Sequence, residues 1–188
     1  LREPPEFEGN YDPHVWFDVS LWMSAVETIR NSMIEHLPAH RDVLQSNGKK
    51  YLDELAVLHA ECKTRLGIIP KERRVLVTAH DAFGYFGRAY DLEVFAIQGI
   101  STESEAGIKK MNDLVNVLVE RKIGAVFVES TVNPRSIEAL VQGCSGRGHP
   151  IKIGGQLYSD AMGAEGTPEG TYVGMVRKNI DVIVKALQ

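Results

Sequence analysis

The chain has 188 residues, 44% of them hydrophobic and 24% charged, and a formal net charge of −4 at pH 7. This length and composition predict a globular protein with one domain, or with one domain and a substantial appendage. The negative charge argues against a nucleic-acid surface, which usually needs a basic face. No apolar run reaches the roughly 18 residues that a membrane span requires.

The first ten residues have the composition of a loop and lack the basic flank and apolar stretch of a signal peptide. We therefore expect the chain to begin inside a longer protein, or after a leader that has been removed. A helix should follow, with Asp18 as its N-cap and Pro38 at its end. The residues of its predicted apolar face are Trp22, Val26, Ile29, Met33 and Leu37.

A second and longer helix is predicted over residues 39–66, where apolar residues recur in steps of three and four and form one narrow stripe. At about 1.5 Å per residue this helix would be roughly 40 Å long, which suits a strut lying along the molecule. Coiled-coil dimerisation is an alternative explanation of the stripe. Cys62 on this helix and Cys144 on a later one lack Cys-x-x-Cys spacing, so we expect buried free thiols rather than a disulfide.

From residue 71 onwards, short apolar strands alternate with helices. This alternation predicts an α/β fold with a four-stranded parallel sheet, wound by right-handed crossovers and flanked by helices. Asn133 is expected to cap the helix that Pro134 opens. The strands are predicted over residues 75–78, 94–97, 125–128 and 151–153, and the helices over residues 82–90, 105–122, 134–142 and 171–187.

Three of these strands lead to a potential metal ligand. The first runs into His80, the third into Glu129 and the fourth on to Asp160. Ligands bind outside the carboxyl ends of parallel strands, so these side chains should converge at one rim of the sheet. His14, just before the first helix, is a fourth candidate. Two imidazoles with one or two carboxylates predict a site for a divalent metal.

Each candidate also has an ordinary structural explanation. His80 could cap or pack at its strand-to-helix turn, and the adjacent Asp81 could cap the following helix. Asp160 could form an Asx turn. Glu129 could orient a ligating histidine from behind, bind the metal itself or cap a helix. The other histidines are expected to have surface or capping roles, and they are His36, His40, His59 and His149.

Covalent catalysis has little support in the sequence. Ser130, His80 and Asp160 could in principle form a triad, but no nucleophile elbow surrounds the serine. The Gly154-Gly155 pair shows no phosphate-loop pattern.

Five motifs in chain order carry a family resemblance. They are DPHVWFD (12–18), TAHDAFGYF (78–86), FVES (127–130), LYSDAMG (157–163) and EGTYVGM (169–175). Together they resemble the metal-type solute-binding proteins of bacterial ABC transporters, the TroA, PsaA and ZnuA kind. The resemblance covers nearly all 188 residues.

Such proteins have two lobes joined by one long rigid helix, with the metal held between the lobes. The resemblance implies that residues 1–38 are a remnant of the N-terminal lobe. Residues 39–70 would then form the inter-lobe helix, and residues 71–188 the C-terminal α/β lobe. Family members carry a first His ligand in the part of the N-terminal lobe that is mostly absent from these residues.

The same resemblance implies the ligand set. It makes His14 the remaining metal ligand of the N-terminal lobe, and His80 and Asp160 the pair contributed by the C-terminal lobe. Members with a histidine at the position of His80 handle zinc or manganese, so the cargo is either Zn²⁺ or Mn²⁺. Nitrogen ligands with one carboxylate suit tetrahedral zinc, whereas a bidentate carboxylate with added oxygen ligands suits manganese.

The implied function is capture of the metal outside the cytoplasmic membrane and delivery to an ABC transporter permease, without catalysis. The location would be periplasmic or otherwise extracytoplasmic, and the protein would be free or a membrane-anchored lipoprotein. It would contact the membrane only through the permease or a lipid anchor outside this chain.

Two rival hypotheses remain at this point. One is a metal-dependent hydrolase that uses the same histidines and aspartate, with Glu129 as general base. The other is a module without metal, in which the strand-end residues only cap helices. On its own, the chain would expose apolar inter-lobe surface, so we expect it to self-associate.

Overall fold

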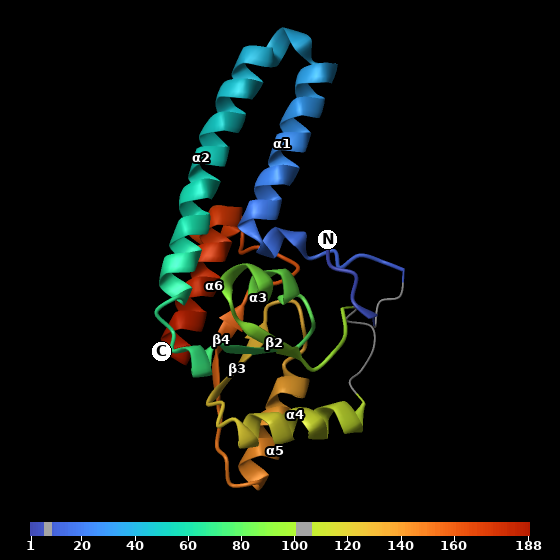
Figure 1. Ribbon diagram of the computed structural model, residues 1–188, viewed down its shortest axis with the longest axis vertical. Coiled ribbons are helices and arrows are strands. Elements are labelled where there is room, and N and C mark those ends of the chain that lie inside the picture. Colours follow the sequence, from blue (N-terminus) through green and yellow to red (C-terminus); the bar gives the residue numbers. More distant parts are fainter. Residues whose placement is uncertain (6–8, 101–106) are drawn as a thin grey trace.

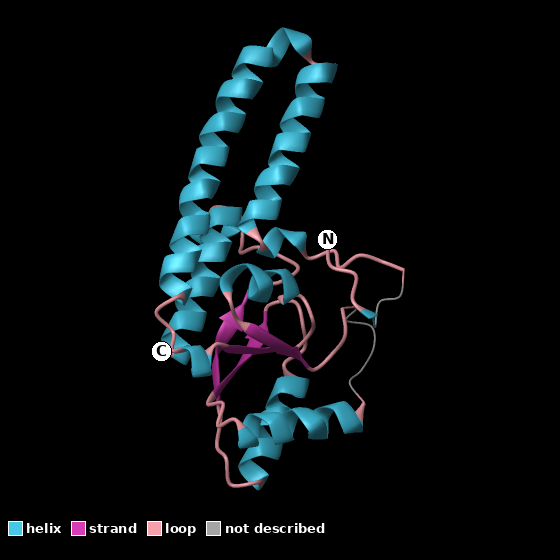
Figure 2. Cartoon of the chain, viewed as in Figure 1, coloured by secondary structure: helices cyan, strands magenta, loops and turns pink. Residues whose placement is uncertain are grey.

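The computed structural model describes residues 1–5, 9–100 and 107–188. Two long helices are followed by four short strands that alternate with helices, as Figures 1 and 2 show. The predicted α/β class is therefore confirmed. The helices are α1 (Val19–His36), α2 (Arg41–Leu66), α3 (Gly84–Tyr90), α4 (Ile108–Glu120), α5 (Arg135–Gly146) and α6 (Tyr172–Leu187). The strands are β1 (Val75–Thr78), β2 (Glu93–Ala96), β3 (Ala125–Glu129) and β4 (Lys152–Leu157).

The four strands form two hydrogen-bonded parallel pairs, β1 with β2 and β3 with β4. Because β1 lies beside β3, the order across the layer is β2, β1, β3, β4. The sequence predicts one continuous four-stranded sheet, whereas the described residues have no backbone ladder between β1 and β3. Just past β1, the backbone amide of His80 donates to the Glu129 side chain, 2.9 Å away, instead of to a β3 carbonyl.

Side-chain caps mark the starts of α1 and α5. The Asp18 side chain accepts a hydrogen bond from the backbone amide of Ser20 (3.0 Å), which confirms this residue as the N-cap of α1. Asn133 likewise accepts from the amide of Arg135 (3.1 Å), although α5 begins one residue later than predicted. Asp81 does not cap α3, because that helix begins only at Gly84, with Phe83 in the cap position.

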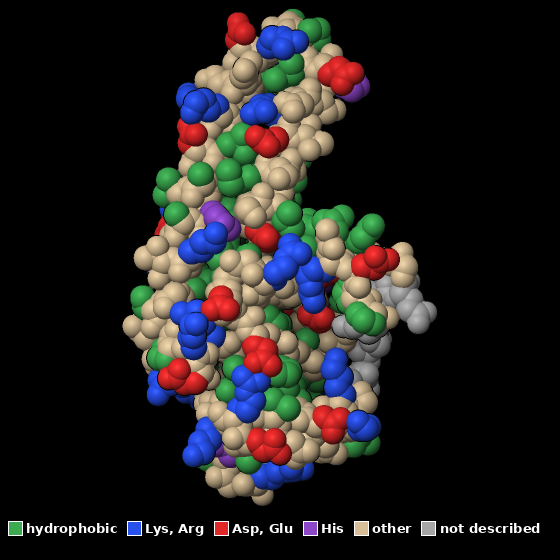
Figure 3. Space-filling model, in the orientation of Figure 1, with side chains coloured by type: hydrophobic (Ala, Val, Ile, Leu, Met, Phe, Trp, Pro, Cys, Tyr) green, Lys and Arg blue, Asp and Glu red, His purple; other side chains and the backbone are tan. Residues whose placement is uncertain are grey.

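The α1 and α2 helices form an antiparallel hairpin that projects from the rest of the molecule (Figure 1). At the base of the hairpin the stripe on α2 is fully buried, through Leu55, Leu58, Cys62 and Leu66. The predicted apolar face of α1 is buried only in part. Ile29, Met33 and Leu37, which lie toward the tip, are 55%, 41% and 47% exposed. In Figure 3, hydrophobic side chains are visible along this hairpin among charges of both signs.

The core has two clusters. The larger one joins α2, α3 and α6 to the strands through residues such as Phe86 and Phe127, and contains Cys62. The other packs α4 and α5 against the strands through Leu118 and Leu140, and contains Cys144. Both cysteines are buried and free, as predicted. None of the helices in the described part of the chain is long and apolar enough to cross a membrane.

The β4 strand lies very close to α6 because two consecutive glycines leave room for the helix. A Cβ atom at Gly154 would lie 2.7 Å from that of Ala186, and one at Gly155 would lie 2.6 Å from Cγ1 of Val182. Gly155 also has a φ of +150°, which other residues rarely adopt. This close packing fixes the position of β4, whose carboxyl end leads to Asp160.

Candidate metal centre

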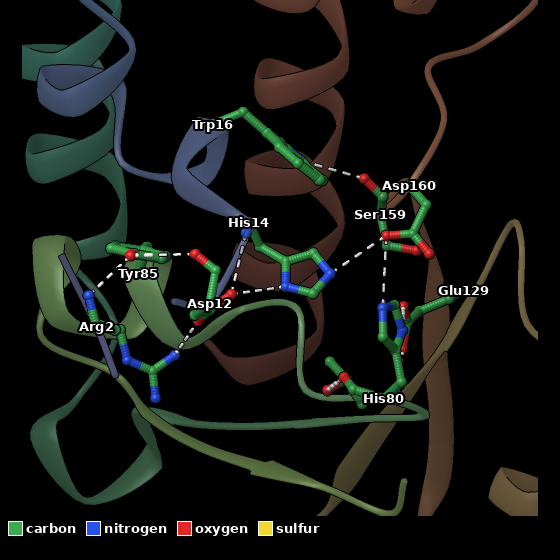
Figure 4. A network of polar contacts seen from close by, with 10 residues as sticks. Arg2, Asp12, His14, Trp16, His80, Tyr85, Glu129, Ser159 and Asp160 are labelled. Carbon is green, nitrogen blue, oxygen red and sulfur yellow. Dashed lines mark hydrogen bonds and ion pairs between the residues drawn. The ribbon is translucent and has the colours of Figure 1, made fainter. Parts of the chain in front are cut away.

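Three predicted site residues meet at the carboxyl ends of the strands, as Figure 4 shows. Nε2 of His14 and Nε2 of His80 each lie 3.5 Å from Oδ1 of Asp160. One ligand atom from each of the three residues lies within 4.8 Å of the others. Atoms bound to one tetrahedral zinc ion at about 2.0–2.2 Å are about 3.4 Å apart. The spacing therefore fits a single ion bound by all three side chains.

Glu129, the last residue of β3, contacts His80 on the side of the ring away from Asp160. The carboxylate accepts a hydrogen bond from the His80 backbone amide, and its Oε2 lies 2.6 Å from Nδ1 of the ring, in a contact poorly aligned for a second hydrogen bond. Nε2 of the same ring is buried and has no hydrogen-bond partner. A buried nitrogen of this kind is costly in a native protein unless it has a role such as metal ligation.

His14 has an equivalent partner in Asp12. Oδ1 of Asp12 accepts a hydrogen bond from the His14 backbone amide (3.0 Å) and lies 2.8 Å from Nδ1 of the ring. A proton on Nδ1 shared with this carboxylate leaves Nε2 with a free lone pair, directed toward Asp160. Outer carboxylates that fix a histidine tautomer in this way are common around metal sites.

Asp160 lies in a loop that is fixed at several points. The amide group of Asn179, on α6, donates to the backbone carbonyl of Tyr158 (2.8 Å) and accepts from its backbone amide (2.9 Å). The indole of Trp16 donates to the carbonyl of Ser159 (3.2 Å), the residue just before Asp160. The Asp160 side chain itself remains 37% exposed. It borders an apolar cleft of about 410 Å³ that Trp16 also lines.

The electrostatics of the site favour a cation. Burial works to lower the pKa of His80, but Glu129 and then Asp160 outweigh it and raise that pKa above its usual value. Burial works to raise the pKa of Asp12, but the hydrogen bonds from His14 and the charge of Arg2 outweigh it and lower that pKa. Asp12 is therefore ionised. Its charge and those of Glu129 and Asp160 favour a bound divalent ion.

The remaining histidines lie elsewhere and have other contacts. A ring nitrogen of His36 lies 2.8 Å from the carbonyl of Ser32, and one of His149 lies 2.8 Å from that of Ile123. Nδ1 of His59 lies 3.2 Å from the hydroxyl of Tyr90, which the sequence does not predict, and His40 is exposed.

Sequence reasoning missed Asp12, Trp16 and Asn179 as parts of this site. Asp12 had a detectable signal, because an aspartate side chain often accepts a hydrogen bond from the backbone amide two residues later, which here is that of His14. Asn179 had a weaker one, since it is a polar residue next to the apolar positions of α6. The partner of Trp16 is 143 residues away and leaves no local signal.

Comparison with known proteins identifies the family. A family model described as "ZnuA: Zinc-uptake complex component A periplasmic" matches residues 2–186. The chain belongs to this family. Membership confirms the resemblance to metal-type solute-binding proteins that the five motifs carry.

Individual relatives agree. The "Manganese-binding lipoprotein MntA" of Bacillus subtilis is 49% identical over 185 residues, covering 98% of this chain and 60% of that protein. The "Zinc-binding protein TroA" of Treponema pallidum is 48% identical over 180 residues, covering 96% of this chain and 58% of that protein. A solved structure of the periplasmic zinc-binding TroA matches with a TM-score of 0.94 at 47% identity, over 98% of this chain and 66% of that one. The chain thus spans about three fifths of these two relatives' length.

Proposed function

We propose that this chain is part of an extracytoplasmic solute-binding protein that captures Zn²⁺ or Mn²⁺ as cargo and delivers it to an ABC transporter permease. The main support is the pair of imidazole nitrogens that lie 3.5 Å from the same carboxylate oxygen of Asp160. In this proposal His14, His80 and Asp160 bind the metal directly. Glu129 orients His80 from behind.

The division of the chain forms part of the same proposal. Residues 1–38 belong to an N-terminal lobe, residues 39–70 to the inter-lobe helix and residues 71–188 to a C-terminal lobe. The 26 residues of α2 support this division, because such a helix spans about 39 Å and connects distant parts rigidly. The ligands then come from both sides, with His14 on one and His80 with Asp160 on the other.

Both metals fit the donor set. Two imidazole nitrogens and a carboxylate suit zinc, and the relatives include a protein named for manganese as well as one named for zinc. Any such site should bind zinc more tightly than manganese in vitro, because the affinity of a given set of ligands rises from manganese to zinc. Affinity alone therefore does not identify the biological cargo.

The position of Glu129 favours binding over hydrolysis. A general base must reach the water that a catalytic metal activates. The Glu129 carboxylate instead faces the backbone amide and Nδ1 of His80, which are the side of the ring away from Asp160. In this position the carboxylate can orient a metal ligand, but it is poorly placed to take a proton from a metal-bound water.

Metal titration of the full-length protein tests the proposal. We expect Zn²⁺ to bind with 1:1 stoichiometry, and His14→Ala, His80→Ala and Asp160→Ala each to weaken binding in competition with a chromogenic chelator. His149→Ala is the matched control and should bind like the wild type. A His80→Ala variant with wild-type affinity would show that the ligand assignment is wrong.

The proposed partner and location need a separate test. Metal uptake by cells that lack this protein should fall, and the wild-type gene, but not the His80→Ala form, should restore it. Fractionation of the same cells should recover the protein outside the cytoplasmic membrane, free or attached to it as a lipoprotein. Recovery in the cytoplasm would contradict delivery to a permease from outside.

A further inference from the structure

The segment that precedes His14 is bonded to α3 through Arg2 and Asp12. The backbone amide of Arg2 donates to the hydroxyl of Tyr85 (2.8 Å), and that hydroxyl donates to the backbone carbonyl of Asp12 (3.2 Å). The Asp12 amide donates in turn to the carbonyl of Arg2 (3.0 Å). Nη1 of Arg2 lies 2.6 Å from Oδ2 of Asp12. Figure 4 shows this closed network beside His14.

Both side-chain oxygens of Asp12 have bonding partners. Oδ1 contacts the backbone amide and Nδ1 of His14, while Oδ2 is paired with Arg2. The Asp12 side chain is fully buried, and that of Arg2 is 27% exposed. Charge-assisted hydrogen bonds are strong and directional in such surroundings. The carboxylate cannot rotate without losing a bond to His14 or to Arg2.

A missing side chain makes room for Arg2. Gly84 is the first residue of α3, and a Cβ atom there would overlap the guanidinium group of Arg2. The guanidinium carbon of Arg2 also lies 5.7 Å from the centre of the Tyr85 ring. The glycine is therefore needed at this place for space, so that the arginine can reach Asp12.

A turn alone does not account for these contacts. An aspartate that only closes a turn needs one oxygen, bonded to the backbone amide of His14. Here the second oxygen pairs with an arginine, and the first also contacts the imidazole ring. These two additional contacts are the ones that would determine which nitrogen of His14 carries the proton and where the ring points.

We propose that Asp12 is a positioning residue for His14, and that Arg2, seated on Gly84 and Tyr85 of α3, holds Asp12 in place. The inference rests on the proposed function, since it concerns the affinity of the same site. It means that α3 affects metal binding although neither Gly84 nor Tyr85 is a ligand. Removing an outer carboxylate of this kind typically weakens metal affinity about 10–100-fold.

Arg2→Gln separates positioning from simple electrostatics, because the two predict opposite signs. A guanidinium group repels a divalent cation, so loss of its charge alone would tighten metal binding. If Arg2 instead acts by holding Asp12, its loss should weaken binding. Gly84→Ala keeps the charge but displaces the guanidinium group, so it should weaken binding as well. Asp12→Asn keeps the size and the turn bond of Asp12 while removing the charge that pairs with Arg2.

The test is a Zn²⁺ competition titration of the full-length protein and these three variants, with Gly146→Ala as the matched glycine control. A Cβ atom at Gly146 would meet nothing within 4 Å. We expect about 10–100-fold weaker binding for Asp12→Asn and a smaller loss for Arg2→Gln and Gly84→Ala, with no change in the control. Nitrogen NMR of the metal-free protein should find the proton of neutral His14 on Nδ1 in the wild type. In Asp12→Asn it should be distributed over both nitrogens.

Three outcomes would overturn the inference. Unchanged or tighter binding in Arg2→Gln would show that Arg2 does not hold Asp12 in place, and unchanged binding in Asp12→Asn would reduce Asp12 to a turn residue. An unchanged His14 tautomer in Asp12→Asn would do the same, even if Gly84→Ala were too unstable to measure. Failure of the proposed function looks different, because the wild type itself would then bind no more zinc than His80→Ala.

Discussion

Glu129 contacts His80 at two points, since its Oε1 accepts a hydrogen bond from the His80 backbone amide and its Oε2 lies 2.6 Å from Nδ1 of the ring. Asp12 likewise contacts both the backbone amide and the ring of His14, although it uses the single oxygen Oδ1 for both. Each imidazole is therefore backed by a buried carboxylate that also fixes its main chain. Rings restrained in this way need little reordering when a metal binds.

The first prediction concerns the contribution of Glu129. Glu129→Gln should weaken Zn²⁺ binding by the full-length protein about 10–100-fold, because His80 loses the charge behind its ring. The loss should be smaller than that caused by His80→Ala, which removes a ligand. Competition titration measures both. Glu138→Ala, an exposed glutamate on α5, is the control and should bind like the wild type. A loss as large as that of His80→Ala would instead make Glu129 a direct ligand.

The second prediction concerns pH. Glu129 and Asp160 outweigh burial and raise the pKa of His80, so this ring keeps its proton to a higher pH than an ordinary histidine, whose pKa is about 6.5. Metal binding must displace that proton. Affinity should therefore fall as the pH decreases through the raised pKa.

In the metal-free protein, the stability of the fold has the opposite pH dependence. A raised pKa stabilises the protonated folded protein below about pH 6.5, and this stabilisation is lost as the pH rises through the raised value. The displacement of the His80 proton by metal can be measured directly. Calorimetric zinc titration in two buffers of different ionisation enthalpy should detect proton release on zinc binding, and this release should be smaller in His80→Ala. Equal release in the two proteins would assign the proton to another group.

The third prediction concerns association of the 188-residue chain by itself. Ile29, Met33 and Leu37 expose apolar surface along one side of α1, and such surface promotes association. We expect dimers by light scattering at high protein concentration, and weaker Zn²⁺ binding than in the full-length protein. The double variant Ile29→Glu and Met33→Glu should be monomeric. Thr28→Glu, which changes an exposed residue off this stripe, should leave association intact.

The fourth prediction concerns the cysteines. Burial raises the pKa of the Cys62 thiol to about 11 and also raises that of Cys144. Since the thiolate is the reactive form, neither residue should react with iodoacetamide at pH 8 in the folded protein. Both should react in denaturant without any reductant, as mass spectrometry would show. A requirement for reductant would mean that the two cysteines form a disulfide.

Much of the site can be predicted from the sequence because parallel strands share a direction. His80 and Asp160 lie beyond the carboxyl ends of β1 and β4, and Glu129 is the last residue of β3, so their convergence follows from the fold class alone. His14 follows no strand, and its place beside them depends on how α1 packs. Asn179 escaped prediction because its partner, the backbone of Tyr158, is set by a tertiary contact. Asp12 had a local signal in its bond to His14, whereas its pairing with Arg2 depends on the fold.

The α1 helix shows a second limit of prediction from the sequence. Its periodicity correctly groups Ile29, Met33 and Leu37 on one side, but it does not say what covers them. All three remain exposed in this chain, whereas residues at the same spacing on α2 are buried at the base of the hairpin. Spacing identifies a shared face, and burial depends on whether another element lies against it.

The contact between α6 and the metal loop has a mechanical consequence. Asn179 bonds both backbone groups of Tyr158, and the glycines of β4 let the side chains of Ala186 and Val182 on α6 pack directly on the strand backbone. Helix, strand and the Asp160 loop should therefore move as one rigid unit. A displacement of α6 should therefore carry the Asp160 carboxylate with it and change its distance from Nε2 of His14, which is 3.5 Å here.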